Sequence, residues 1–194
     1  YDSRQTQAGE AFVAVPGFAS DGYRFIPKVI ERGAAVIICE REPEQKVQYV
    51  QVADCRKALA QLSANWFSHP ADKMTMIGVT GTNGKTTITY LLKTVLEQTL
   101  GAKVGLIGTI QNMIGDTVIE TERTTPESFE LQKLFYEMVQ AGCTHCVMEV
   151  SSHALVLHRA DEISFETGVF TNLTEDHLDF HKTMEAYCEA KAML

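Results

Sequence analysis

The residues that point most directly to chemistry form a glycine-rich segment ending in Gly-Lys-Thr, at positions 78–87 (GVTGTNGKTT). An apolar run at 74–77 precedes it and a helical pattern follows it, which predicts a strand, a tight turn and a helix N-terminus. Backbone N–H groups of such a turn, together with the helix dipole, attract anions. Lys85 would reach the β/γ-phosphates of a nucleoside triphosphate, and the Thr86 hydroxyl would take a Mg2+ site.

This segment departs from the usual P-loop at one position. The usual motif has a glycine five residues before the glycine of Gly-Lys, where this chain has Val79, and the glycines stand instead at 78, 81 and 84. An ordinary glycine-rich turn that ends in lysine is the alternative interpretation. The strand and the helix expected on either side favour the nucleotide site.

Polar side chains follow two later strands. Glu149 lies near the end of the apolar run 145–150, where a carboxylate beside a P-loop would be a further oxygen ligand for Mg2+. A solvated glutamate at a strand end is the alternative. After the strand expected at 168–171, the segment 175–181 (EDHLDFH) combines acids with two histidines, which predicts a metal or phosphate site.

Two further motifs have weaker signals. Lys191 lies on a helix rich in Ala and Tyr, and composition alone favours a solvated face for it. Cys143 and Cys146 form a C-x-x-C pair, but no second cysteine pair completes a zinc site. We therefore predict that both are buried structural thiols.

From residue 74 onward, strands alternate with helices. Strands are expected at 74–79, 103–110, 145–150 and 168–171, and helices at 85–99, from Pro126 to Gly142 and at 183–194. Pro126 suits the first turn of its helix. This alternation predicts a parallel, doubly wound sheet, whose ligands gather at the carboxyl ends of the strands.

Residues 1–68 form a separate pattern of short strands at 11–15, 34–39 and 47–52, with helices at 25–33 and 56–66. The segment 69–72 (HPAD) interrupts this pattern. We therefore expect two α/β domains, one over residues 1–70 and one over residues 71–194.

Composition narrows the class of protein. The 194 residues are 45% hydrophobic and 22% charged, as in an ordinary globular protein. A net charge of −8 without a Lys/Arg run argues against nucleic-acid binding. No apolar stretch approaches the about 20 residues that a membrane span needs. The given residues contain no signal-peptide pattern, and five cysteines predict a reducing compartment, so we expect a cytoplasmic protein.

Five blocks, in their order and spacing, resemble the Mur ligases of peptidoglycan synthesis: GTNGKTT, TTPE, MEVSSHAL, TNLTEDHLDFH and YCEAK. The TTPE and EVSSHAL blocks look most like the MurE branch, the UDP-N-acetylmuramoyl-tripeptide synthetases. Three stretches near the start, at 1–4 (YDSR), 9–14 (GEAFVA) and 17–22 (GFASDG), are similar to that branch's uridine-binding domain. The resemblance covers essentially the whole chain.

The resemblance implies a small α/β UDP-binding domain followed by a P-loop-type, mostly parallel sheet domain. It implies an ATP-dependent amide ligase with ATP and Mg2+ as cofactors. The substrates would be UDP-MurNAc-L-Ala-D-Glu and a diamino acid, meso-diaminopimelate or L-lysine. Phosphorylation turns the unreactive carboxylate into an acyl phosphate, which the amine attacks, and positioning with Mg2+ supplies most of the catalysis.

Matched position by position, the resemblance implies roles for the following residues. The ATP phosphates would be held by Gly81, Thr82, Asn83, Gly84, Lys85 and Thr86. The metal ligands would be Thr86, Glu149 and His177. The UDP-MurNAc-dipeptide would be held by Thr124, Thr125, Ser151 and Arg159, with Tyr1 and Ser3, next to Asp2, at the uridine. Lys191 matches the lysine that the family carbamylates, and the catalytic residues would be Lys85, Lys191 and His177.

Two positions depart from the family pattern. Many relatives have Asn where this chain has Arg123, and Gln where it has Leu157. The chain opens at Tyr1 without Met and stops at Leu194 within a helix. We therefore expect missing residues at both ends, including the family's C-terminal domain with its amino-acid site, and no ligation by this segment alone.

Two other functions are open. Folylpolyglutamate synthetase is a related ligase, but its P-loop usually reads Gly-Lys-Gly-Ser, unlike residues 84–87, and it lacks a uridine-type domain. A non-catalytic nucleotide-binding module on the Mur scaffold is the second, and the intact Lys85, Glu149, His177 and Lys191 argue against it. The sequence does not specify the diamino acid.

Overall fold

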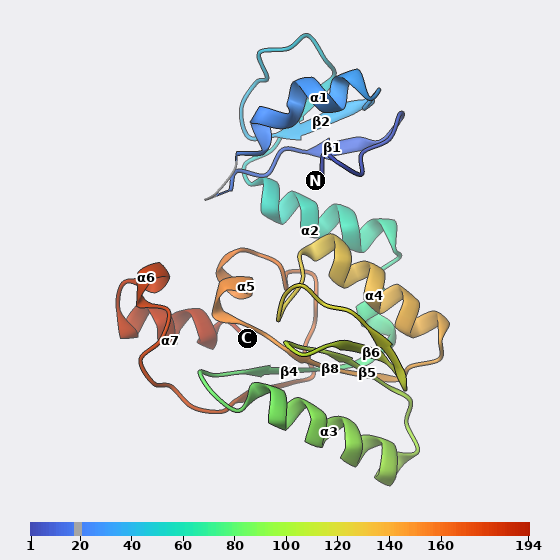
Figure 1. Cartoon of the computed structure of the whole chain (residues 1–194), viewed down its shortest axis with the longest axis vertical. Helices are drawn as coiled ribbons and strands as arrows, with labels where there is room; N and C mark the ends of the chain where they lie inside the picture. The colour runs from blue at the N-terminus through green and yellow to red at the C-terminus, as the bar shows by residue number, and fades with distance from the viewer. Residues whose placement is uncertain (18–20) are drawn as a thin grey trace. The chain divides into compact units, whose positions relative to one another are not determined.

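The computed structural model describes residues 1–17 and 21–194 and divides the chain into two compact units, Tyr1–Leu59 and Ala60–Leu194 (Figure 1). Helix α2 (Cys55–Trp66) crosses the division. Residues 18–20 of the GFASDG block lie outside the described residues. Among the described residues, no helix combines the length and apolar character of a membrane span.

The unit Tyr1–Leu59 contains a three-stranded parallel sheet of β1 (Ala11–Val13), β2 (Val36–Cys39) and β3 (Tyr49–Gln51), in that order. Alternate residues of a strand point to opposite faces. Phe12 and Ile37 accordingly pack with α1 (Ile26–Glu31), which the turn η1 (Gly22–Phe25) precedes, while Val13 and Ile38 pack with the first turns of α2. Both faces of this small sheet are therefore covered.

The unit Ala60–Leu194 contains a six-stranded sheet in the order β7-β6-β5-β8-β4-β9. Its strands are β4 (Thr75–Thr80), β5 (Val104–Ile107), β6 (Asn112–Ile114), β7 (Thr117–Ile119), β8 (His145–Glu149) and β9 (Thr167–Phe170). β5, β8, β4 and β9 run parallel, which confirms the predicted mostly parallel α/β class. The antiparallel hairpin β6-β7 was not predicted.

Helices cover both faces of the larger sheet (Figure 1). The turn η2 (Pro70–Lys73) leads into β4, and α3 (Lys85–Leu100) packs on one face over Val79, Val104 and Val147. On the other face lies α4 (Ser128–Gln140), whose Leu131, Phe135 and Met138 join the main core. Three short helices follow β8: α5 (Ser152–Val156), α6 (Leu178–His181) and α7 (Met184–Ala192).

The start of α4 differs from the prediction by two residues. Pro126 was expected in the first turn, but the helix begins at Ser128 and Glu127 is its N-cap. The Thr125 hydroxyl donates to the Glu149 carbonyl oxygen at 2.9 Å, which ties this segment to the end of β8 instead of to the helix. Cys143 and Cys146 are both buried and free, as predicted.

The parallel register determines where the candidate residues emerge. Val79 of β4 pairs with Glu149 of β8, and Thr80 pairs with Phe170 of β9. The loops that follow these strands therefore leave the sheet at the same edge, which is where ligands of parallel α/β sheets bind.

Candidate functional site

The glycine-rich turn after β4 has the strand-turn-helix context that the sequence predicts. Gly81 has φ +134, and a Cβ atom there would lie 1.9 Å from Thr171 Oγ1, so the position requires glycine. Asn83 N–H donates to Asn172 Oδ1 at 3.0 Å, and the Thr171 hydroxyl donates to the Asn83 carbonyl at 2.7 Å. The segment after β9 thus fixes the turn, and α3 begins directly after Gly84.

Two lysine ammonium groups converge on this turn. Lys85 Nζ donates to the carbonyl oxygens of Gly81 and Thr82, both at 2.8 Å, and Lys191 Nζ donates to the Gly81 oxygen at 2.9 Å. Burial, and then the charge of Lys191, lowers the pKa of Lys85, while Glu149 opposes that shift. Two cations at one carbonyl oxygen repel each other, so the position attracts an anion.

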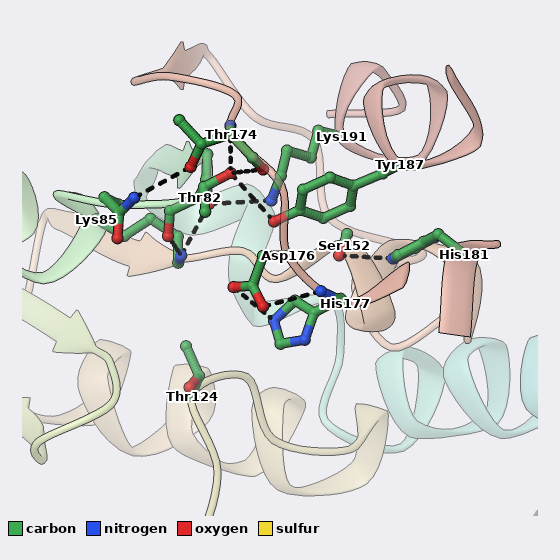
Figure 2. A network of polar contacts seen from close by, with 12 residues as sticks. Thr82, Lys85, Thr124, Ser152, Thr174, Asp176, His177, His181, Tyr187 and Lys191 are labelled. Atoms are coloured by element: carbon green, nitrogen blue, oxygen red, sulfur yellow. Dashed lines mark hydrogen bonds and ion pairs between the residues drawn. The ribbon is translucent and has the colours of Figure 1, made fainter. Parts of the chain in front are cut away.

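Lys191 does not lie on a solvated face, contrary to the expectation from composition. Its residue is only 2% exposed, and burial lowers the pKa of its amine to about 8, a shift that Asp176 opposes. The ammonium lies over the Tyr187 ring, 4.3 Å from the centroid, as a cation–π contact requires. Figure 2 shows both side chains pointing from α7 toward Thr82.

Tyr187 is a site residue that the sequence analysis missed. Thr82 Oγ1 donates to the Thr174 carbonyl and accepts from the Thr174 N–H, each at 3.1 Å (Figure 2). A hydroxyl has one hydrogen, so Tyr187 Oη is the donor in its 3.3 Å contact with Thr82 Oγ1. Tyr187 and Lys191 are four residues apart, which puts both on one helix face. This spacing could have indicated that Tyr187 lies at the same site as Lys191.

Glu149 is buried, at 1% exposure, so the solvated-glutamate alternative is wrong. Its Oε1 accepts from the Thr86 hydroxyl and from Thr109 N–H, both at 2.9 Å, and its Oε2 accepts from the Thr109 hydroxyl at 3.0 Å. Carboxylate and hydroxyl oxygens are the atoms that Mg2+ prefers, so Thr86 and Glu149 fit that ion. Thr109 was missed because it was placed inside a strand, whereas β5 ends at Ile107.

The four residues matched to the UDP-MurNAc-dipeptide lie in a network next to Glu149. Thr124 Oγ1 contacts Thr109 Oγ1 at 3.0 Å, and Ser151 N–H donates to Thr125 Oγ1 at 3.1 Å. Arg159 Nη1 donates to the Thr125 carbonyl at 3.2 Å, and its Nη2 lies 2.9 Å from Glu127 Oε1. The structure therefore brings these residues together; their binding roles stay predictions.

The acids and histidines of 175–181 do not gather around one point. His181 Nε2 contacts Ser152 Oγ at 2.9 Å and is buried, and His177 Nε2 lies 3.5 Å from Asp176 Oδ2. The His153 ring lies 4.8 Å from that of His177. Burial, and then the His177 charge, lowers the pKa of both His153 and His181.

Within residues 1–17 and 21–194, no group of three or more His, Cys, Asp or Glu side chains is arranged to hold a metal ion. His181 instead fixes Ser152 on α5. Thr86 and Glu149 contact each other, whereas His177 lies among the aromatic rings of α5–α7. The metal role of His177 therefore stays a prediction.

The residues matched to the uridine site lie in the other unit. Ser3 is buried and Tyr1 is exposed, and Arg32 Nη1 donates to the carbonyl oxygens of Ser3 and Arg4 at 2.8 and 2.7 Å. The Arg4 guanidinium binds the Asp2 carboxylate and lowers the pKa of Asp2 to about 2. These contacts order the turn at residues 3–5; the uridine role stays a prediction.

Comparisons with known proteins place the chain in a family. The Mur ligase middle domain matches residues 79–194, and the Mur ligase family catalytic domain matches residues 1–67. UDP-N-acetylmuramoyl-L-alanyl-D-glutamate--2,6-diaminopimelate ligase 1 of Clostridium acetobutylicum is 55% identical over 100% of this chain and 40% of its own length. The ligase of the same activity from Clostridium botulinum is 50% identical over 100% of this chain and 41% of its own.

A solved structure of a UDP-N-acetylmuramoyl-L-alanyl-D-glutamate--2,6-diaminopimelate ligase superposes with a TM-score of 0.87 at 31% identity. The superposition covers 99% of this chain and 39% of that one. The chain thus spans about 40% of the length of the curated relatives that it matches. With the middle-domain match extending from the glycine-rich turn to Leu194, the chain belongs to the Mur ligase family.

Proposed function

We propose that the protein containing this chain is an ATP-dependent amide ligase of peptidoglycan synthesis, which joins a diamino acid to UDP-MurNAc-L-Ala-D-Glu. The observation that carries the proposal is the convergence of Lys85 and Lys191 on the Gly81 carbonyl, beside the contact between Thr86 and Glu149. The sequence left diaminopimelate and lysine open. The names of the relatives favour 2,6-diaminopimelate.

In this proposal the turn from Gly81 to Thr86 holds the ATP phosphates, and Lys85 stabilises their negative charge. Thr86 and Glu149, with His177, would hold Mg2+, which when bound neutralises charge on the phosphates. Thr124, Thr125, Ser151 and Arg159 orient the acceptor, so that its carboxylate receives the phosphoryl group and then meets the amine. Positioning of this kind accounts for much of the rate in such transfers.

Lys191 is proposed to be carbamylated. An amine with a pKa of about 8 is neutral in roughly a tenth of the molecules at pH 7. The neutral amine adds to CO2 through its nitrogen lone pair and releases one proton, which leaves a carbamate anion. Burial beside Gly81 and Tyr187 supports this role, because the contacts with these two residues fix the side chain and burial depresses the pKa of its amine.

The domain roles follow from the same proposal. Residues 1–70 would bind the uridine end through Tyr1 and Ser3, and residues 71–194 would bind ATP. We place the activity in the cytoplasm, which the five free cysteines support.

The test is ligation by the full-length product of the gene that encodes this segment. Supplied with UDP-MurNAc-L-Ala-D-Glu, ATP and Mg2+, it is expected to form the tripeptide with meso-diaminopimelate, and to release ADP and phosphate. Glu149→Gln, which keeps the shape but removes the charge, is expected to lose most of that activity. ATP binding without product from diaminopimelate or lysine would instead favour the non-catalytic alternative.

A further inference from the structure

The side chain of Tyr187 joins α7 to the glycine-rich turn (Figure 2). The residue is only 1% exposed, and its Oη donates to Thr82 Oγ1 at 3.3 Å. The centroid of its ring lies 4.3 Å from the Lys191 ammonium and 5.0 Å from the centroid of the His181 ring. These contacts hold the ring in place and fix the direction of its hydroxyl.

The Thr82 hydroxyl is the group that the Tyr187 hydroxyl contacts. It also donates to the Thr174 carbonyl oxygen and accepts from the Thr174 N–H, each at 3.1 Å. A hydroxyl has one hydrogen and two lone pairs, so these three contacts use its hydrogen-bonding capacity in full. With all its partners in the protein, the Thr82 hydroxyl affects a bound phosphate only through the conformation that it gives the turn.

The ring of Tyr187 has a separate effect, on the amine of Lys191. A cation–π contact by itself favours the charged ammonium, whereas removal from water favours the neutral amine. Burial lowers the pKa of this amine to about 8, so the removal from water outweighs the contact with the ring. Because the ring covers the amine that the Gly81 carbonyl holds at 2.9 Å, it contributes to this burial.

Packing alone does not account for a tyrosine at this position. A phenylalanine would fill the same space and present the same ring to Lys191, without a polar group to bury. A buried hydroxyl costs free energy unless it is hydrogen-bonded, and this one is bonded to the turn that follows β4. The ring and the hydroxyl of Tyr187 therefore have two different partners, Lys191 and Thr82.

We propose that Tyr187 is a positioning residue: its hydroxyl holds Thr82 in the conformation that binds the phosphates, and its ring keeps the Lys191 amine beside Gly81 and shielded from water. The inference rests on the proposed function, which places ATP at the turn and a carbamate on Lys191. In the carbamylation step the amine nitrogen bonds to the carbon of CO2, one C–O π pair moves onto oxygen, and the amine releases one proton. Tyr187 acts before this step, on the unmodified amine, and takes no part in the bond that forms.

The hydroxyl is tested by calorimetric titration of the full-length gene product with Mg-ATP. Tyr187→Phe removes only the hydroxyl and is expected to raise Kd about fivefold, as the loss of one hydrogen bond does. Thr82→Val removes its partner and is expected to raise Kd by at least as much. In the double variant, Tyr187→Phe is expected to add nothing to the effect of Thr82→Val, because it acts through Thr82. Tyr136→Phe, at an exposed position of α4, is the matched control and is expected to leave Kd unchanged.

The ring is tested by carbon-13 NMR of the full-length gene product in labelled bicarbonate, which detects a carbamate directly. The signal of Lys191 is assigned by its loss in Lys191→Met. Tyr187→Phe keeps the ring and is expected to keep the wild-type intensity. Tyr187→Leu and Tyr187→Met, which are apolar without the ring, are expected to lower the intensity about tenfold or more, because each unit by which the pKa returns toward 10.5 lowers the neutral fraction about tenfold.

The outcomes separate this inference from the proposed function. Equal Kd for wild type and Tyr187→Phe, or an effect that adds in full to that of Thr82→Val, overturns the role of the hydroxyl. Wild-type carbamate intensity in Tyr187→Leu or Tyr187→Met overturns the role of the ring. A wild-type protein without the carbamate signal overturns the carbamylation of Lys191 and the role of the ring with it. A wild-type protein that binds Mg-ATP but forms no tripeptide overturns the ligase function alone, since neither test here depends on ligation.

Discussion

The two units differ in how many side chains from separate segments come together at their candidate sites. In Ala60–Leu194, side chains from five separate segments converge: the turn after β4, Thr109, the 124–127 segment, Glu149 and α7. In Tyr1–Leu59, the matched residues are ordered mainly through backbone carbonyls that Arg32 binds. The candidate site of the larger unit is thus defined by side chains from distant segments, whereas the matched residues of the smaller unit are held mainly by contacts to the backbone.

The candidate site of the larger unit is therefore easier to identify from geometry than that of the smaller unit. Gly81 is required by a 1.9 Å approach to Thr171, and Glu149 is buried with three donors around it. Burying a carboxylate without a paired cation costs free energy that hydrogen bonds only partly offset, which favours a functional role for Glu149. The turn at residues 3–5 is held by Arg32 and by the pair of Asp2 and Arg4, so its geometry alone does not reveal a ligand.

Among substitutions at the candidate site of Ala60–Leu194, Lys85→Ala is expected to have the largest effect. We expect ATP turnover by the full-length protein to fall by more than about tenfold, which is more than about 1.4 kcal/mol of barrier, because the cation placed at the Gly81 turn is removed. Lys133→Ala serves as the matched control, and circular dichroism checks the fold. Retention of more than a tenth of the activity would remove Lys85 from the phosphate site.

A smaller effect concerns the second lysine of that turn. The pKa of Lys191 is about 8 in the folded chain, against an ordinary value of 10.5, so between pH 8 and 10.5 the unfolded state binds more protons. Burying Lys191 therefore destabilises the fold fully below pH 8, and this cost declines as pH rises to 10.5.

Carbon-13 NMR of labelled lysine in CO2-free buffer, where Lys191 is a free amine, is expected to give a titration midpoint near pH 8 for Lys191, with the signal assigned through Lys191→Met. In urea the same signal is expected to titrate near 10.5, which provides the reference. A native midpoint near 10.5 would show that Lys191 is not desolvated. It would remove Lys191 from the buried side chains that distinguish the larger unit from the smaller one.

The sequence predicted what depends on local chemistry and missed what depends on tertiary packing. The glycine turn, the parallel strands β4, β5, β8 and β9, and Glu149 at the end of β8 were all predictable, because each has a local pattern of apolar runs and turn residues. The hairpin β6-β7 was not predicted, although strands of the same length, β1 and β3, were.

Lys191 and Thr109 show where a prediction from local sequence patterns fails. Composition placed Lys191 on a solvated face, but contacts with Gly81 and the Tyr187 ring bury it. Thr109 contacts Glu149 only because β5 ends early at Ile107. Both contacts join segments that are far apart in the chain, so a pattern within one segment does not predict them.

The most direct test is whether the two units bind different ligands. The full-length gene product and a variant of it that lacks Tyr1–Leu59 are titrated calorimetrically with Mg-ATP and with UDP-MurNAc-L-Ala-D-Glu. We expect the variant to bind Mg-ATP still, although weakly, and to lose affinity for the UDP-linked acceptor. Retained acceptor affinity in the variant, or loss of Mg-ATP binding by a variant that is still folded, would contradict this expectation.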